Sequence, residues 1–67
     1  MIGTVKWFNA NKGYGFIAPD NGGADIFVHV SDVRKSQMQE LHEGQRLSFE
    51  LGNARNGKVC ATRLAIL

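Results

Sequence analysis

Cysteine and proline are almost absent from this chain: Cys60 and Pro19 are the only examples in 67 residues. A single cysteine excludes an intrachain disulfide, and a small domain without one is typical of a reducing compartment. No stretch approaches the roughly 20 apolar residues that a membrane span needs. The N-terminus enters a strand pattern directly, without the features of a signal peptide. We therefore expect a cytoplasmic protein with no membrane association.

Residues that could bind a metal ion or carry out catalysis are also scarce. The two histidines, His29 and His42, lie in different regions, and neither has a cysteine or carboxylate at ligand spacing. Cys60 has no visible base partner, so a small hydrophobic residue in a strand is the better interpretation. The sequence predicts no cofactor, no metal site and no enzymatic activity.

Charge is low as well. The formal net charge is +2, and Lys6 and Lys12 are the only charged side chains among the first 19 residues. A net charge of +2 is too small to indicate nucleic-acid binding by itself. The positions of the few lysines therefore carry more information than their number.

Five strand-like runs separated by turn residues dominate the chain, and helical periodicity is lacking. The runs cover about Ile2–Asn9, Tyr14–Ala18, Asp25–Val30, Gln45–Leu51 and Lys58–Ile66. In the fourth run, Leu47, Phe49 and Leu51 are expected to face the core. The long connection 31–44 has room for one helical turn beginning at Ser31. This pattern predicts an all-β, five-stranded antiparallel Greek-key barrel of the oligonucleotide-binding (OB) type.

The second and third strands have an aromatic face and an aliphatic face. Residues two apart in a strand share a face, which groups the rings of Tyr14, Phe16, Phe27 and His29 opposite Ile17, Ile26, Val28 and Val30. A small barrel cannot bury both faces, so the rings are expected on the outside. Contiguous exposed aromatic side chains on a small protein indicate a binding partner.

Residues near these rings point to unpaired nucleic acid as that partner. Lys6 and Lys12 flank the aromatic residues and are expected to contact phosphates, while bases stack on the rings. Trp7 is two residues from Val5, which is expected to face the core, so strict alternation would point both inward. Strand twist or a bulge can turn the indole outward. Phe8 fits either a partly buried edge of the patch or the core. Arg55 and Lys58, in or beside a turn, are weaker phosphate candidates.

The glycines around Tyr14 do not form a nucleotide-phosphate loop. Such a loop is followed by a helix whose N-terminus meets the phosphates, and here a strand follows. Gly15 is better explained as a strand glycine that lets either a neighbouring backbone approach or the barrel bend.

Several motifs together resemble the cold-shock domain family in order and spacing. They are Lys6-Trp7-Phe8-Asn9, Lys12-Gly13-Tyr14-Gly15-Phe16-Ile17, Pro19-Asp20, Gly22-Gly23, Asp25-Ile26-Phe27-Val28-His29, Ser31 and Glu43-Gly44-Gln45. The resemblance covers nearly the whole chain and implies a single domain over residues 1–67. It also implies a five-stranded barrel that binds single-stranded RNA and DNA with little sequence preference. In bacteria, such proteins melt unwanted RNA structure, often under cold stress.

Two positions depart from the family pattern. Val30 and Met38 stand where relatives commonly have aromatic residues, so the resemblance places both on a shortened stacking surface. The predicted nucleic-acid-binding residues are Lys6, Trp7, Phe8, Lys12, Tyr14, Phe16, Phe27, His29, Val30, Met38, Arg55 and Lys58. We expect a monomeric, ATP-independent RNA chaperone. A protein-interaction module that uses the same aromatic patch is the alternative.

Overall fold

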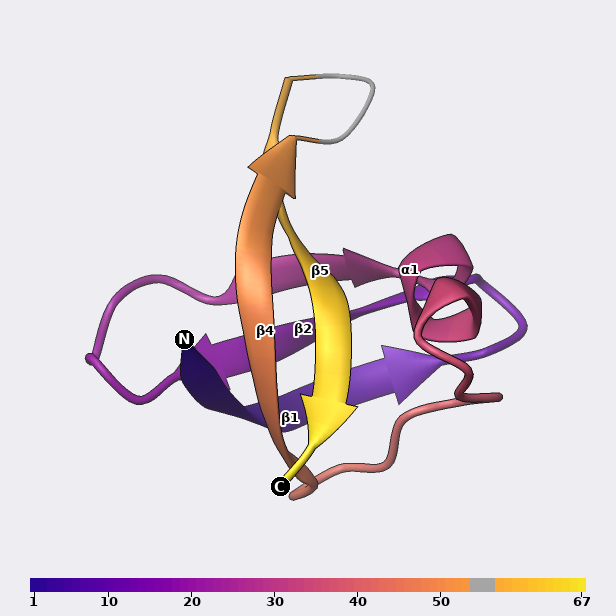
Figure 1. Ribbon diagram of the computed structural model, residues 1–67, viewed down its shortest axis with the longest axis horizontal. Coiled ribbons are helices and arrows are strands. Elements are labelled where there is room, and N and C mark those ends of the chain that lie inside the picture. The colour runs from indigo at the N-terminus through magenta and orange to yellow at the C-terminus, as the bar shows by residue number, and fades with distance from the viewer. Residues whose placement is uncertain (54–56) are drawn as a thin grey trace.

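Five strands and one short helix make up the computed structural model, which describes residues 1–53 and 57–67 (Figure 1). In chain order they are β1 (Ile2–Asn9), β2 (Tyr14–Pro19), β3 (Ile26–His29), α1 (Val30–Lys35), β4 (Arg46–Asn53) and β5 (Val59–Ile66). Each strand end lies within two residues of the predicted one. The largest differences are that β4 continues to Asn53 and that Val30 belongs to α1 instead of β3. The predicted all-β class is confirmed.

The strands form a closed barrel in the order β1-β2-β3-β5-β4. Four of the neighbouring pairs are antiparallel, and β3 pairs with β5 in parallel through Phe27 and Cys60. A ring with an odd number of strands cannot alternate direction throughout, so one parallel contact is unavoidable. The predicted barrel is therefore confirmed, with this one junction differing from a purely antiparallel arrangement.

Helix α1 packs against the closed barrel at the junction of β3 and β5. The Leu64 backbone N–H donates to Ser36 Oγ at 2.9 Å, just after the helix, and the Thr62 hydroxyl donates to Asp32 Oδ1 at 3.2 Å. Val33 reaches the core from the same helix and is fully buried. The helix has six residues, which agrees with the single turn expected near Ser31. No helix in the part of the chain that the structure describes is long and apolar enough to span a membrane.

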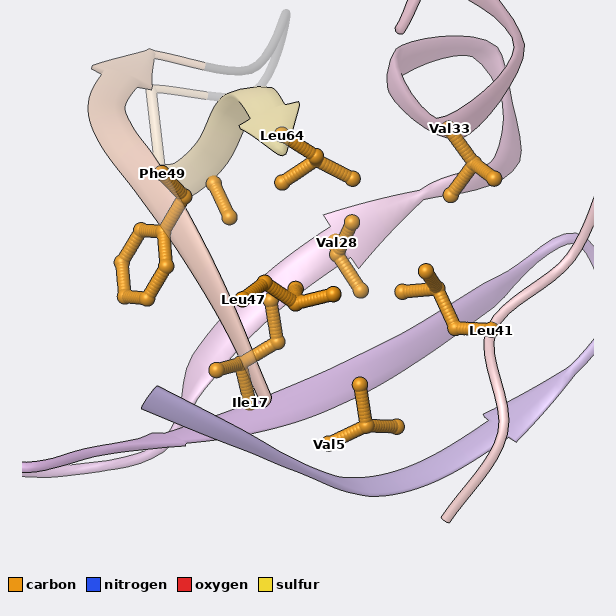
Figure 2. Packing of buried hydrophobic residues seen from close by; sticks show 9 residues of the cluster. Val5, Ile17, Val28, Val33, Leu41, Leu47, Phe49 and Leu64 are labelled. Atoms are coloured by element: carbon orange, nitrogen blue, oxygen red, sulfur yellow. The ribbon is translucent and has the colours of Figure 1, made fainter. Parts of the chain in front are cut away.

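The core fills the barrel interior with aliphatic side chains and one aromatic ring. Side chains from the strands, α1 and the loop before β4 converge there (Figure 2). Each fully buried Val, Leu, Ile or Phe contributes about 1.5–3 kcal/mol relative to exposure, so this small set supplies most of the stability. The buried set is Val5, Ile17, Val28, Val33, Leu41, Leu47, Phe49, Ala61 and Leu64.

The prediction that Leu51 faces the core is wrong. Leu47 and Phe49 are buried, whereas Leu51 is 49% exposed. The β4–β5 hairpin projects beyond the barrel (Figure 1), and Leu51 pairs with Ala61 in this hairpin. The pairing of β4 with β5 shifts in register between Ser48 and Glu50, so the strict alternation that placed Leu51 inside is interrupted just before this residue.

An ion pair on the outside of the barrel joins segments that are distant in sequence. Arg46 donates to both carboxylate oxygens of Asp20 at 2.8 Å and to Thr4 Oγ1 at 3.1 Å. These hydrogen bonds are the main reason that the pKa of Asp20 lies below its ordinary value. A lowered carboxyl pKa stabilises the fold above the usual pKa of aspartate, and this contribution is lost as the pH falls through the lowered value.

Candidate nucleic-acid interface

The outer face of β1, β2 and β3 carries a cluster of five rings. In β2, burial alternates so that Gly15 and Ile17 are buried while Tyr14 and Phe16 are partly exposed. The register pairs Tyr14 with His29 and Phe16 with Phe27, so each ring of β2 has a ring opposite it on β3. Trp7 pairs with Phe16 from the other side. We call this surface the aromatic platform: Trp7, Tyr14, Phe16, Phe27 and His29.

The rings of the platform contact one another and lie in two main orientations. Trp7 and Phe16 are 28° apart with centroids at 6.4 Å, and Tyr14 and Phe27 are 25° apart at 5.6 Å. Between these pairs the rings meet edge to face, with interplanar angles of 65° to 88°. The platform is therefore a herringbone of rings that support each other, with no single flat plane.

A β-bulge in β1 places Trp7 on the platform. Val5 pairs with Ile17 and Trp7 pairs with Phe16, which leaves Lys6 as the extra residue of the bulge. Val5 is consequently buried at 1% exposure although it shares the sequence parity of Trp7. Of the two features that could turn Trp7 outward, strand twist and a bulge, the structure has the bulge, with Lys6 exposed in it.

Gly15 allows β1 and β2 to approach closely beneath the rings. A Cβ atom at this position would lie 2.3 Å from the Trp7 carbonyl oxygen and 2.8 Å from the Phe8 Cα atom. The interpretation of Gly15 as a close-approach glycine is confirmed. Gly13, in the turn before it, has φ of +85°, a conformation that favours glycine. The two glycines set the turn and the strand spacing that bring Tyr14 toward Trp7.

His29 ends β3 and also caps the short helix. Its Nδ1 atom accepts a hydrogen bond from the Ser31 backbone N–H at 3.1 Å, and the Ser31 hydroxyl lies 2.9 Å from the same nitrogen. An accepting Nδ1 assigns the proton of the neutral ring to Nε2, which is available for a hydrogen bond to a ligand. The cap holds the imidazole 6.4 Å from the Phe27 ring. The sequence predicted a ring for stacking and hydrogen bonding at this position but not the cap.

The lysines beside the platform differ in their surroundings. Lys12 is exposed in the β1–β2 turn, near Tyr14, and its backbone N–H donates to Asn9 Oδ1 at 3.0 Å. Lys6 is exposed next to Trp7, but its Nζ atom lies 3.0 Å from Asp25 Oδ2. Lys58 is exposed immediately before β5, and the predicted contact residue Arg55 lies outside the described residues. The two main lysines thus lie at opposite ends of the platform, one of them paired with a carboxylate.

The sequence matches known proteins over nearly its whole length. Residues 1–66 match the model of the family described as 'Cold-shock' DNA-binding domain. The chain belongs to the cold-shock domain family. It is similar to a probable cold shock protein, y4cH, of Sinorhizobium fredii, with 56% identity over 63 residues, or 92% of this chain and 91% of the relative. It is also similar to the cold shock-like protein CspE of Escherichia coli, with 45% identity over 96% of this chain and 93% of the relative.

Three other predicted contact residues of this cold-shock domain lie away from the centre of the platform. Phe8 and Met38 are partly buried and pack against the core cluster. Val30 is half-buried at the start of α1, where its backbone N–H donates to the Gly13 carbonyl at 2.8 Å. Val30 therefore lies at the platform's edge, next to His29 in the chain, whereas Phe8 and Met38 contribute mainly to packing.

Val30→Phe is expected to extend the stacking surface of this cold-shock domain. Val30 is not one of the buried core residues. Its side chain lies beside Gly13, because a Cβ atom built on Gly13 would be 3.4 Å from Val30 Cγ1. A phenyl ring at position 30 would therefore lie over the β1–β2 turn, beside Tyr14. We expect single-strand binding to tighten by about 0.5–2 kcal/mol. Met38→Phe should help less because Met38 packs against the core. Melting temperatures and oligo-dT affinities of both variants provide the test, and a less stable Val30→Phe protein with unchanged affinity would contradict it.

Cys60 is the residue of the cold-shock domain that pairs with Phe27 across the parallel junction. Its side chain is 6% exposed, and burial, together with the negative charge of Asp32, raises the pKa of the thiol. A raised pKa disfavours the reactive thiolate. Within residues 1–53 and 57–67, no group of three or more His, Cys, Asp or Glu side chains could hold a metal ion. Cys60 is thus packed in the last strand as a small, nearly buried side chain, in agreement with its interpretation as a hydrophobic residue.

Proposed function

We propose that this protein binds single-stranded RNA and single-stranded DNA with low sequence specificity, by stacking bases on the aromatic platform. The observation that carries the proposal is the contiguous group of five rings on three adjacent strands, four of them half-buried and the fifth, His29, exposed. Every base has a π-face, so stacking is worth about 1–3 kcal/mol per base for any sequence. Lys6 and Lys12, at the two ends of the platform, contact the backbone phosphates.

The ring geometry favours a single strand over a duplex. A ring of one near-parallel pair is inclined by 65° to 88° to the neighbouring ring of the other pair. Bases that stack on successive rings must therefore turn relative to one another. Unpaired nucleotides can rotate in this way, whereas paired bases in a duplex are already stacked and fixed. Duplex is therefore a poor ligand.

Selective binding of the open strand makes the protein an ATP-independent RNA chaperone. A ligand that binds only the unpaired form shifts a hairpin toward that form by mass action. This activity suits the cold-shock response, because RNA secondary structure is more stable at low temperature, and it would affect transcription and translation. We place it in the cytoplasm as a monomer in which residues 1–67 form one domain and no chemical step is catalysed.

Titration of Trp7 fluorescence tests the proposal directly, because Trp7 is the only tryptophan and belongs to the platform. Oligo-dT and oligo-U should quench its emission at low salt, and a perfect duplex should not. The logarithm of the affinity should fall linearly with the logarithm of the salt concentration, with a slope of about −0.7 per phosphate contact. Equal quenching by duplex would contradict the proposed mechanism, and a lack of salt-dependent oligonucleotide binding would favour the protein-interaction module.

Phe16→Ala and Phe27→Ala should weaken this binding without unfolding the protein. Both rings are partly exposed and pair with each other across β2 and β3. We expect each change to cost about 1–3 kcal/mol of oligonucleotide binding, measured by titration, and to leave a cooperative thermal transition. A loss of folding in either variant would show that the rings support the core and would contradict the assignment of the platform.

A further inference from the structure

The ion pair between Lys6 and Asp25 lies at the Trp7 end of the platform. Lys6 is the bulge residue of β1, and Asp25 immediately precedes β3. Because β2 lies between β1 and β3 in the sheet, the Lys6 side chain extends across β2 to bring Nζ within 3.0 Å of Asp25 Oδ2. The lysine side chain is 63% exposed and the aspartate side chain 37% exposed. Solvent and a ligand can therefore reach both charges.

This pairing changes what Lys6 offers to a nucleic acid. The ammonium group has a carboxylate partner in the free protein, so a phosphate must compete with that carboxylate for the same cation. A phosphate that succeeds also lies near a negative charge. The Lys6–Asp25 locus has a net charge near zero, in contrast to the exposed Lys12 at the other end of the platform.

We propose that Asp25 is a positioning residue that holds Lys6 across β2 and competes with the nucleic-acid backbone for its charge. The inference rests on the proposed single-strand binding and concerns how strongly that binding depends on charge. With Lys6 held in this way, stacking on the rings carries most of the affinity and the backbone contributes less.

Asp25→Asn tests the proposal because it removes the charge and keeps the size of the side chain. With Lys6 released, oligo-dT binding should become tighter at low salt, and the salt slope should steepen by about 0.7, the value for one added phosphate contact on a single strand. The advantage over the wild type should accordingly shrink about fivefold for each tenfold rise in salt concentration. A merely structural role for Asp25 would not change this slope.

Two further variants separate the action of Asp25 from a general charge effect. Asp20→Asn changes the net charge by the same amount, but Asp20 pairs with Arg46, so its salt slope should match the wild type. Lys6→Ala combined with Asp25→Asn should lose the gain, because Asp25 is proposed to act through Lys6. Thermal melts of each variant show whether the protein is folded in the titrations.

The outcomes distinguish this inference from the proposed function. If the wild type does not bind oligo-dT, both are overturned. If the wild type binds and Asp25→Asn leaves the slope unchanged, or binds more weakly, only the role of Asp25 is overturned, and weaker binding would indicate that its carboxylate contacts the bases. An equal gain in Asp20→Asn, or a gain that persists without Lys6, would also overturn it.

Discussion

Phe49→Ala is expected to leave the protein largely unfolded at room temperature. Phe49 is 2% exposed and is the largest fully buried side chain of the described core. Removing a buried phenyl ring costs about 3–5 kcal/mol, and a domain of this size rarely has more than about 3–5 kcal/mol of net stability. Thermal unfolding followed by far-ultraviolet circular dichroism would show a lost or strongly lowered transition.

Leu51→Ala is the matched control for Phe49→Ala. It lies two residues further along the same strand, but it is 49% exposed. Its loss should cost much less stability because the side chain remains largely in water in the folded state. Equal destabilisation by the two changes would contradict the placement of Leu51 outside the core.

Gly15→Ala is expected to separate β1 from β2 and to destroy the platform at the same time. The new Cβ would lie 2.3 Å from the Trp7 carbonyl oxygen and 2.8 Å from the Phe8 Cα atom, both in the backbone of β1. A backbone cannot move aside as a side chain can, so the cost should reach or exceed the roughly 1–3 kcal/mol typical of overpacking. Thermal melts and oligo-dT titration should both show the loss.

Gly23→Ala provides the comparison for this change. Gly23 is exposed, and the nearest atom to an added Cβ would be Asn21 Oδ1 at 3.0 Å. This atom accepts a hydrogen bond from the Gly23 N–H at 2.8 Å, but it is the end of an exposed side chain that needs to shift by only a few tenths of an ångström. We expect near-normal stability and binding. A Gly15→Ala protein as stable as Gly23→Ala would show that the two strands can separate at little cost, and that the glycine is not required there.

Alternation and turn residues predicted the architecture because they act locally. In β2, the regular exchange of ring and aliphatic side chain leaves only one arrangement that buries Ile17 and exposes Phe16, and the structure shows that arrangement. The turns before β2 and β3 are rich in glycine and asparagine, so the ends of the first three strands could also be predicted from the sequence. These local signals were enough to predict that four of the five platform rings share one face of the sheet.

Two of the features that were not predicted, the exposure of Leu51 and the Lys6–Asp25 ion pair, depend on segments that are distant in sequence. Strict alternation would bury Leu51, but the pairing of β4 with β5 shifts in register between Ser48 and Glu50, and the β4–β5 hairpin projects beyond the barrel. Lys6 and Asp25 are 19 residues apart, and their ion pair requires the sheet order to be known. The cap formed by His29 on Ser31 had a local signal, the histidine two residues before an N–H that starts a helix, but histidine is not among the usual capping residues.

The mutual packing of the platform rings affects the entropy of binding. In the free protein, the centroids of neighbouring rings lie 5.4 to 6.4 Å apart, and the His29 ring is fixed by its hydrogen bond to Ser31. Side chains that are already restricted lose little rotational freedom when a ligand arrives, which removes part of a cost of about 0.5–1.5 kcal/mol per immobilised side chain. In the proposed complex, the unfavourable conformational entropy would therefore come mostly from the nucleic-acid strand, so a flexible strand would bear a greater penalty than a stiff one of equal length.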